Sequence, residues 1–193
     1  MPKIVDADRQ RDEIRNAARV VFAERGVRGT GLAHVAAAAG MGRSSLYHYY
    51  PDKDSLLGDL VKEMLDQELA MFRECLRSPE PPIARLENLA RACAALFPEW
   101  ALFGRMILDL RLADVQFLKR TFRALRRELA AVLAEGQENG SFAAELNADV
   151  TASLLIGTID GLLLQYFIDP RALPKPAEIA DTLFLTTRRI VEK

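Results

Sequence analysis

The corner Gly40-Met41-Gly42 constrains the fold of this chain most, because it joins two short helical stretches, residues 32–39 and 43–50. Three residues leave room only for a tight turn. Glycine reaches the left-handed conformation that closes a helix without a Cβ clash, so we expect Gly40 to end the first stretch. The alanines of residues 36–39 let the second stretch cross the first closely. The pattern predicts a helix-turn-helix, a motif that binds double-stranded DNA.

The second stretch carries most of the side chains expected to contact DNA. Arg43, Ser44 and Ser45 lie at its start, where the arginine can read guanine or bind a phosphate. Tyr47 and His48 lie on the next turn, placed to hydrogen-bond to phosphate oxygens and so fix the register on the duplex. We therefore predict that this stretch is the recognition helix.

The helices on either side complete the unit. Pro51 stops the recognition helix, Asp52 is suited to cap the next one, and Lys53 stands at its N-terminus, where free amides favour phosphate. A preceding helix presents an apolar face of five residues at helical spacing: Ile14, Ala17, Ala18, Val21 and Phe22. The prediction for residues 1–52 is a three-helix DNA-binding domain with its own small core.

These motifs together resemble the TetR family of transcriptional regulators. The resemblance lies in Ile14-x-x-Ala17-Ala18-x-x-Val21-Phe22-Ala23-Glu24-x-Gly26, Val35-Ala36, Ala39-Gly40, Leu46-Tyr47-x-Tyr49-Tyr50 and Lys53-x-x-Leu56-Leu57. It implies an all-helical homodimer in which the N-terminal unit binds a near-palindromic operator and a larger C-terminal domain binds a small-molecule effector. Most such proteins are repressors that the effector releases from DNA.

Two positions depart from the family's pattern. Where the family usually has a Ser or Thr that caps the second helix and touches phosphate, this chain has Gly31. Thr30 either takes over that phosphate contact or the contact is lost. Ala33 offers only a methyl group where some members place a base-contacting residue, and His34 beside it is the candidate substitute.

The rest of the chain, residues 53–193, keeps a helical pattern, and we expect an all-α protein of about nine helices. The helices expected here span residues 53–77, 83–97, 100–112, 114–138, 147–168 and 176–191. Pro98 is expected to end the second of them, and Asn139-Gly140 the fourth. The first leaves the DNA-binding domain and enters the effector-binding and dimerisation domain, so it is placed to act as a lever.

Residues 150–168 are nearly long and apolar enough to span a membrane, and they contain a glycine pair, Gly157 and Gly161. Asp160 argues against a span, because an isolated aspartate is costly inside a bilayer. We expect instead a helix buried in a bundle, with the glycines allowing another helix to approach closely. In the family's pattern the last two helices form the dimer interface, and the final one offers four apolar residues: Ile179, Leu183, Phe184 and Ile190.

The effector site is predicted among apolar and aromatic residues in the middle of the C-terminal domain, which suit an apolar or aromatic ligand. The candidates are Trp100, Phe103, Met106, Ile107 and Phe122. Ordinary core packing is the commoner explanation for any one of them. Arg105, Asp109 and Asp160 are candidates for holding a polar end of the ligand.

A basic stripe lies on one helix of this domain, formed by Arg120, Arg123, Arg126 and Arg127. Such a run is usually a solvated face, here with Glu128 and acidic neighbours as pairing partners. The formal net charge of the whole chain is only −1. This value disfavours a third class of function, a sequence-indifferent architectural DNA protein, because nonspecific affinity rests mainly on phosphate neutralisation.

No nucleophile and base pair, phosphate-binding loop or cofactor motif is visible in the sequence, so we expect no enzyme activity and no cofactor. The two histidines lack ligands at metal-binding spacing, so no metal site is expected. Cys75 and Cys93 are expected to be buried thiols of a cytoplasmic protein. The expected partners are operator DNA, an effector and a second copy, with no membrane. The alternative is a helical small-molecule-binding protein or enzyme without sequence-specific DNA binding.

Overall fold

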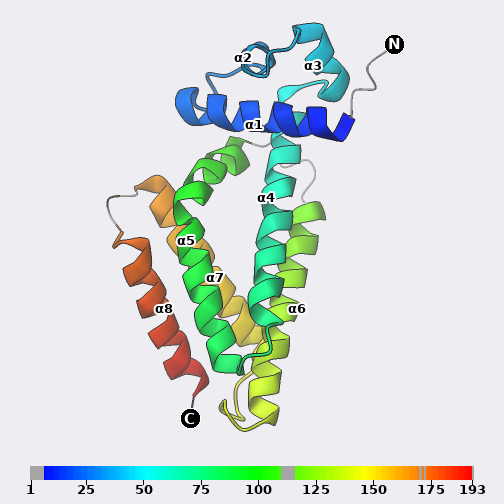
Figure 1. The fold of residues 1–193 in the computed structure, drawn as a ribbon. Helices are drawn as coiled ribbons and strands as arrows, with labels where there is room; N and C mark the ends of the chain where they lie inside the picture. The colour runs from blue at the N-terminus through cyan, green and yellow to red at the C-terminus, as the bar shows by residue number, and fades with distance from the viewer. Residues whose placement is uncertain (1–6, 110–115, 170, 172, 193) are drawn as a thin grey trace. The chain divides into compact units, whose positions relative to one another are not determined.

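A computed structural model describes residues 7–109, 116–169, 171 and 173–192, with the backbone alone for residues 101–109. These residues form eight helices and no strand (Figure 1), which confirms the all-α fold. The helices are α1 (Ala7–Arg25), α2 (Leu32–Ala38), α3 (Arg43–Tyr49), α4 (Lys53–Leu76), α5 (Pro82–Asp109), α6 (Gln116–Glu138), α7 (Ala148–Ile168) and α8 (Pro176–Val191).

Helix α5 corrects one expectation. Pro98 lies inside it, so the helices expected at residues 83–97 and 100–112 are continuous as far as residue 109, and residues 110–112 lie outside the described part. Proline removes one backbone hydrogen bond. Phe97 and Trp100 on either side of it are both buried, and their packing holds the helix through the proline. The described chain therefore has eight helices, where about nine were expected.

The chain divides into two compact units. Among the described residues, the first unit contains residues 7–63 and 105–109, and the second contains residues 64–104 and those from 116 onward. The division falls inside α4, which is one unbroken helix from Lys53 to Leu76. The first turns of α4 thus belong to the same unit as the helix-turn-helix.

The core of the first unit forms on the apolar face of α1, whose five predicted residues are all buried. Val35 of α2 and Leu46 of α3 are also fully buried. The corner between α2 and α3 has the predicted geometry, because Gly40 has a φ of +66°. The Met41 N–H then donates to the Ala36 carbonyl at 3.0 Å, which satisfies an end carbonyl of α2.

Helices α5 to α8 share the core of the second unit. One leucine from each of them, Leu86, Leu129, Leu155 and Leu183, lines a common cavity of about 20 Å³. Ile179 of α8 is buried as well. Ile179 and Leu183 pack inside their own unit and also line an open pocket of about 330 Å³ beside α7, so their place in a dimer interface stays a prediction. Of the other two residues named for that role, Phe184 is half-buried and Ile190 is exposed.

Glu128 of α6 does not pair with the basic stripe of its own helix. Its side chain is almost buried, and it accepts hydrogen bonds from Arg73 Nε of α4 at 3.3 Å and from Nε of Arg77, just after the end of α4, at 2.9 Å. These contacts outweigh its burial and hold the pKa of Glu128 below its ordinary value. The expected pairing of Glu128 with the stripe is wrong, because the carboxylate binds Arg73 and Arg77 instead.

Candidate functional site

The recognition helix α3 presents a row of exposed side chains. All five residues predicted to contact DNA along it are exposed: Arg43, Ser44, Ser45, Tyr47 and His48. The Arg43 guanidinium donates to the Tyr47 hydroxyl at 3.3 Å and lies 5.6 Å from the centre of its ring. The two side chains therefore support each other one helical turn apart, and the row is open to a DNA groove.

The start of α2 is capped by a histidine. Gly31 has the extended conformation of a helix cap, and its N–H donates to His34 Nδ1 at 3.2 Å. The imidazole therefore takes the place that Glu or Gln has in a capping box. Both residues are exposed, and Nε2 of His34 stays available. This contact was not predicted from the sequence, because a capping hydroxyl was expected at position 31 and Gly31 has none.

Thr30 is 2 % exposed, and its hydroxyl donates to the Gly26 carbonyl at 2.7 Å. A buried hydroxyl that already donates to a carbonyl cannot reach a phosphate, so the predicted DNA contact of Thr30 is wrong. Of the two alternatives left open by the sequence, the structure favours loss of this contact.

The beginning of α4 binds back onto the helix-turn-helix. Asp52 accepts a hydrogen bond from the Ser55 N–H at 2.7 Å, which is the predicted cap. Lys53 is half-buried, and its ammonium donates to the Val27 carbonyl at 3.0 Å. Because an ammonium has three donors, Lys53 can fix the loop before α2 and still face a phosphate.

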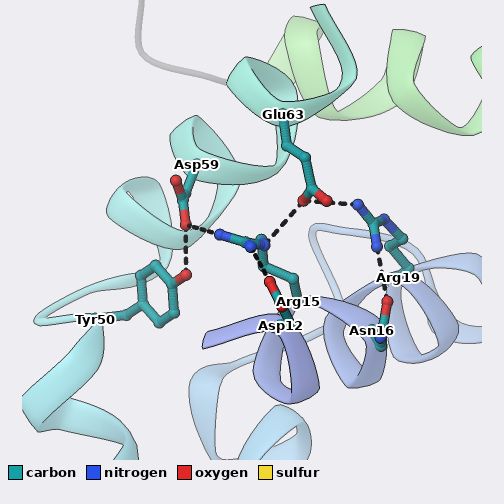
Figure 2. Close-up of polar contacts among 7 residues, drawn as sticks. All are labelled: Asp12, Arg15, Asn16, Arg19, Tyr50, Asp59 and Glu63. Atoms are coloured by element: carbon teal, nitrogen blue, oxygen red, sulfur yellow. Dashed lines mark hydrogen bonds and ion pairs between the residues drawn. The ribbon is translucent and has the colours of Figure 1, made fainter. Parts of the chain in front are cut away.

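Figure 2 shows a polar network that ties α4 to α1 and to the end of α3. The Tyr50 hydroxyl donates to Asp59, which also accepts from Arg15 Nη1 at 3.0 Å. Glu63 pairs with Arg15 at 2.9 Å and with Arg19 at 2.7 Å. The sequence offered a signal for this network, because two arginines and two carboxylates each stand four residues apart and so line facing helix sides.

Asp59 stabilises the first unit at neutral pH. Burial alone would raise its pKa, but the hydrogen bonds from Tyr50 and Arg15 outweigh burial and hold the pKa of this carboxyl below its ordinary value. A lowered pKa in the folded state means that the stabilisation is present above the unfolded value and is lost as the pH falls through the folded one.

We predict that Asp59→Asn lowers the free energy of unfolding by about 1.5–3 kcal/mol at pH 7, the usual value of hydrogen bonds to a charged group. The difference from wild type should shrink as the pH falls below 3.8, the ordinary pKa of the carboxyl. Chemical unfolding at a series of pH values measures it. Asp54→Asn, on an exposed position of the same helix, is the control. A difference that grows on acidification would contradict this role.

The outer face of α7 is apolar and uncovered. Leu154 is 63 % exposed and Ile168 is 71 % exposed, and Val150 and Leu164 lie on the same stripe. Gly157 and Gly161 fall between them, and a Cβ added to either would meet nothing within 4 Å. Length and composition alone would let α7 cross a membrane, and 28 % of the apolar 18-residue stretch within this helix is buried. Because α7 is apolar on most of its sides, its exposed face is expected to pack against another apolar surface.

The predicted effector residues are only partly described. Trp100 is buried and Phe122 is half-buried. The side chains of Phe103, Met106 and Ile107 lie outside the described residues, as do those of Arg105 and Asp109. The prediction of an effector pocket from these residues stays a prediction.

Two carboxyl groups of the second unit have raised pKa values. Burial, with a smaller effect of the Asp160 charge, raises the pKa of Glu68 to about 8. Burial also raises the pKa of Asp160 to about 6, although this residue keeps contact with solvent. Tyr166 of α7 packs edge-on against Phe97 of α5, with ring centres 5.8 Å apart. Glu68 and Tyr166 were missed from the sequence, because each stands alone on a helix otherwise interpreted as core.

The described residues contain no group of three or more His, Cys, Asp or Glu side chains that could hold a metal ion. Both cysteines are free thiols, with Cys93 buried and Cys75 half-buried. Two features of the described residues remain. One is the exposed polar face of α3, and the other is a second helical unit with apolar faces. Together they define a helix-turn-helix DNA-binding regulator.

The chain belongs to the TetR family of bacterial regulatory proteins. Residues 14–60 match the model described as "Bacterial regulatory proteins, tetR family", and residues 108–187 match "BetI-type transcriptional repressor, C-terminal". The two matches cover the helix-turn-helix and most of the second unit. The predicted resemblance is confirmed.

Named relatives agree with this assignment. The transcriptional repressor DhaR of Mycobacterium sp. strain GP1 is 29 % identical over 154 residues, which cover 77 % of this chain and 78 % of DhaR. KstR2 of Rhodococcus jostii strain RHA1, also a transcriptional repressor, is 29 % identical over 157 residues, with 77 % and 76 % covered. FadR from Bacillus subtilis, solved in complex with stearoyl-CoA, shares the fold with a TM-score of 0.74 at 20 % identity, covering 91 % of this chain and 96 % of FadR.

The two family models and these relatives identify the protein as a transcriptional regulator, and DhaR and KstR2 are both repressors. The relatives named above are regulators of transcription. The alternative of a small-molecule-binding protein or enzyme without sequence-specific DNA binding is therefore not favoured.

Proposed function

We propose that this protein binds a near-palindromic operator as a homodimer and leaves it when an apolar or aromatic effector enters the second unit. The observation that carries the proposal is the exposed row on α3, in which Arg43 and Tyr47 are held together above the fully buried Leu46. A helix that is buried on one side and carries donors on the other suits the major groove. As an operator-binding protein it acts in the cytoplasm.

Residues Gly31, His34, Ser44, Ser45, His48 and Lys53 complete the proposed contact surface. Base readout rests on the start of α3, since a bidentate arginine contact to guanine discriminates between base pairs. The later residues and Lys53 bind phosphates and so set the register. Selection of bound sequences from random duplexes, followed by a screen for compounds that release the bound DNA, tests the proposal.

A second copy of the chain is the proposed cover for the α7 stripe. The glycines at 157 and 161 lie open on this face, so a partner helix can approach the backbone closely. An operator with two symmetric half-sites also requires two recognition helices one helical turn of DNA apart. Helix α8 also has two exposed apolar residues, Leu185 and Ile190.

We predict that Leu154→Glu converts the dimer to a monomer, because two-fold symmetry places two buried charges in one interface. Analytical ultracentrifugation of the protein at micromolar concentration, in a buffer without detergent, measures the change in oligomeric state. Val20→Glu makes the same chemical change at an exposed apolar residue of α1 and should leave the dimer intact. A Leu154→Glu protein that remains dimeric would show that the interface lies elsewhere.

The proposed effector has an apolar body. Aromatic residues supply apolar surface in the second unit, with Trp100 and Phe97 buried and Tyr166 half-buried. Glu68, with its pKa raised to about 8, is mostly uncharged at neutral pH and can donate a hydrogen bond to a polar end. The similar FadR was solved with stearoyl-CoA, a ligand with a long apolar chain, which supports an effector of this kind.

Helix α4 is the proposed lever between effector and operator. It is unbroken from Lys53 to Leu76, and the network around Asp59 makes its first turns move with α1 and the end of α3. A shift of α4 would change the spacing of the two recognition helices, so the dimer would no longer match adjacent major grooves. Hydrogen exchange in α4 should change when a releasing compound binds. Release without any such change would exclude the lever.

A further inference from the structure

The basic stripe of α6 has a part that neither the operator nor the effector uses. Arg123, Arg126 and Arg127 line an open groove of about 630 Å³ against the first turns of α7. Its other residues are Ala130, Ala131, Ala134, Ala148, Asp149 and Ser153. The groove therefore has three guanidinium groups above a floor of small apolar side chains.

These arginines lack the carboxylate partners that other arginines of the second unit have. Arg85 pairs with Glu135, and Arg91 pairs with Glu87 and Asp181. Glu128, the acidic residue next to the stripe, pairs instead with Arg73 of α4 and with Arg77 just after that helix. In the described part of the chain, no carboxylate pairs with the three groove arginines, all of which are exposed.

The spacing of the arginines suits a ligand with adjacent phosphate groups. Residues 123, 126 and 127 stand three and four positions apart, so their side chains emerge from one face on neighbouring turns. A guanidinium binds phosphate oxygens through paired donors, and its charge does not titrate at neutral pH. Asp149 offers one opposing charge, which leaves the groove with a formal charge of +2. The N-terminus of α7 faces the same groove and also favours an anion.

We propose that the α6–α7 groove is a binding site for a soluble diphosphate-bearing molecule, separate from the operator surface and from the aromatic residues of the effector site. The arginines hold the two phosphoryl groups, and the alanine floor accommodates the less polar part of the molecule. The site goes beyond operator and effector binding, because it gives the repressor a second ligand.

Isothermal titration of the full-length dimer with inorganic pyrophosphate at physiological salt tests this site. We expect saturable binding that is tighter than that of orthophosphate. Arg126→Ala and Arg127→Ala should each weaken it about tenfold, as expected for loss of a charge-assisted hydrogen bond. Asp149→Asn should tighten it, because the opposing charge is removed. Arg120→Ala, on the same helix but outside the groove lining, should leave it unchanged.

Three results would overturn the proposal. The first is absence of saturable pyrophosphate binding. The second is equal weakening by Arg120→Ala, which would mean a diffuse basic surface. The third is retention on phosphatidylglycerol vesicles without binding of soluble pyrophosphate, which would assign the arginines to a lipid surface. Arg43→Ala serves as a further control, because it removes a charge from the operator surface and should not alter pyrophosphate binding. Operator binding can fail or succeed independently of these outcomes.

Discussion

Arg43→Ala weakens operator binding by about 2–6 kcal/mol, because a bidentate contact to a base contributes about 1–3 kcal/mol and the dimer makes it in both half-sites. The substitution also releases Tyr47, whose hydroxyl and ring both contact the guanidinium. Tyr47→Ala should therefore weaken binding as well. Fluorescence anisotropy with a selected operator measures both variants.

The loss on Arg43→Ala should depend on the DNA sequence. An arginine that reads guanine loses affinity for the operator more than for random duplex, whereas a phosphate contact loses both equally. Arg120→Ala removes the same charge from the second unit and is the matched control. Unchanged operator affinity in both α3 variants would show that α3 is not the recognition helix.

Gly136→Ala destabilises the second unit by about 1–3 kcal/mol, the usual range for overpacking a core. A Cβ at this position would lie 2.1 Å from Cδ2 of Phe142, and Phe142 is fully buried where the chain folds back after α6. The Phe142 N–H also donates to the Gly136 carbonyl at 2.8 Å, which anchors the backbone that carries the ring, and burial of the ring leaves it little room to rotate away. Glycine is the residue that fits.

Thermal unfolding of Gly136→Ala and three further variants separates this clash from a general effect of alanine. Gly58→Ala, in α4 with nothing within 4 Å of the added Cβ, should stabilise by about 0.5–1 kcal/mol. Phe142→Leu removes ring atoms from the clash, so the double variant with Gly136→Ala should lose less stability than the two single changes together. An unchanged melting temperature for Gly136→Ala would contradict the close packing of Phe142.

Local signals in the sequence predicted much of the fold. Gly40 and Gly140 both have positive φ at the ends of their helices, where glycine was expected to close them. The apolar face of α1 is buried residue for residue, because a period of 3.6 places it on one side. Asn147 caps α7 by accepting from the Val150 N–H, so the helix begins within one residue of its predicted start.

Long-range contacts could not be predicted in the same way. Pro98 was expected to end a helix, but burial of its neighbours decides that α5 continues. Glu128 was assigned to the arginines beside it, yet it binds residues more than fifty positions earlier in the chain. Local spacing cannot reveal such a partner.

The candidate site shows the same division. The exposed row of α3 followed from helical spacing, whereas the cap between Gly31 and His34 and the buried hydroxyl of Thr30 depend on local backbone geometry. The sequence showed α7 as an apolar helix with a glycine pair, and the expectation was a helix buried in a bundle. In the structure one stripe of this helix is exposed in a single chain, so that expectation was wrong for its outer face.

The central claim is that a symmetric dimer reads its operator through α3, and selection from a random duplex pool tests it most directly. Full-length protein at physiological salt should enrich a near-palindromic sequence whose half-site centres lie about one helical turn, roughly 10–10.5 base pairs, apart. Excess random DNA should not displace it. Enrichment of no common sequence, or of a single site without an inverted repeat, would contradict the claim.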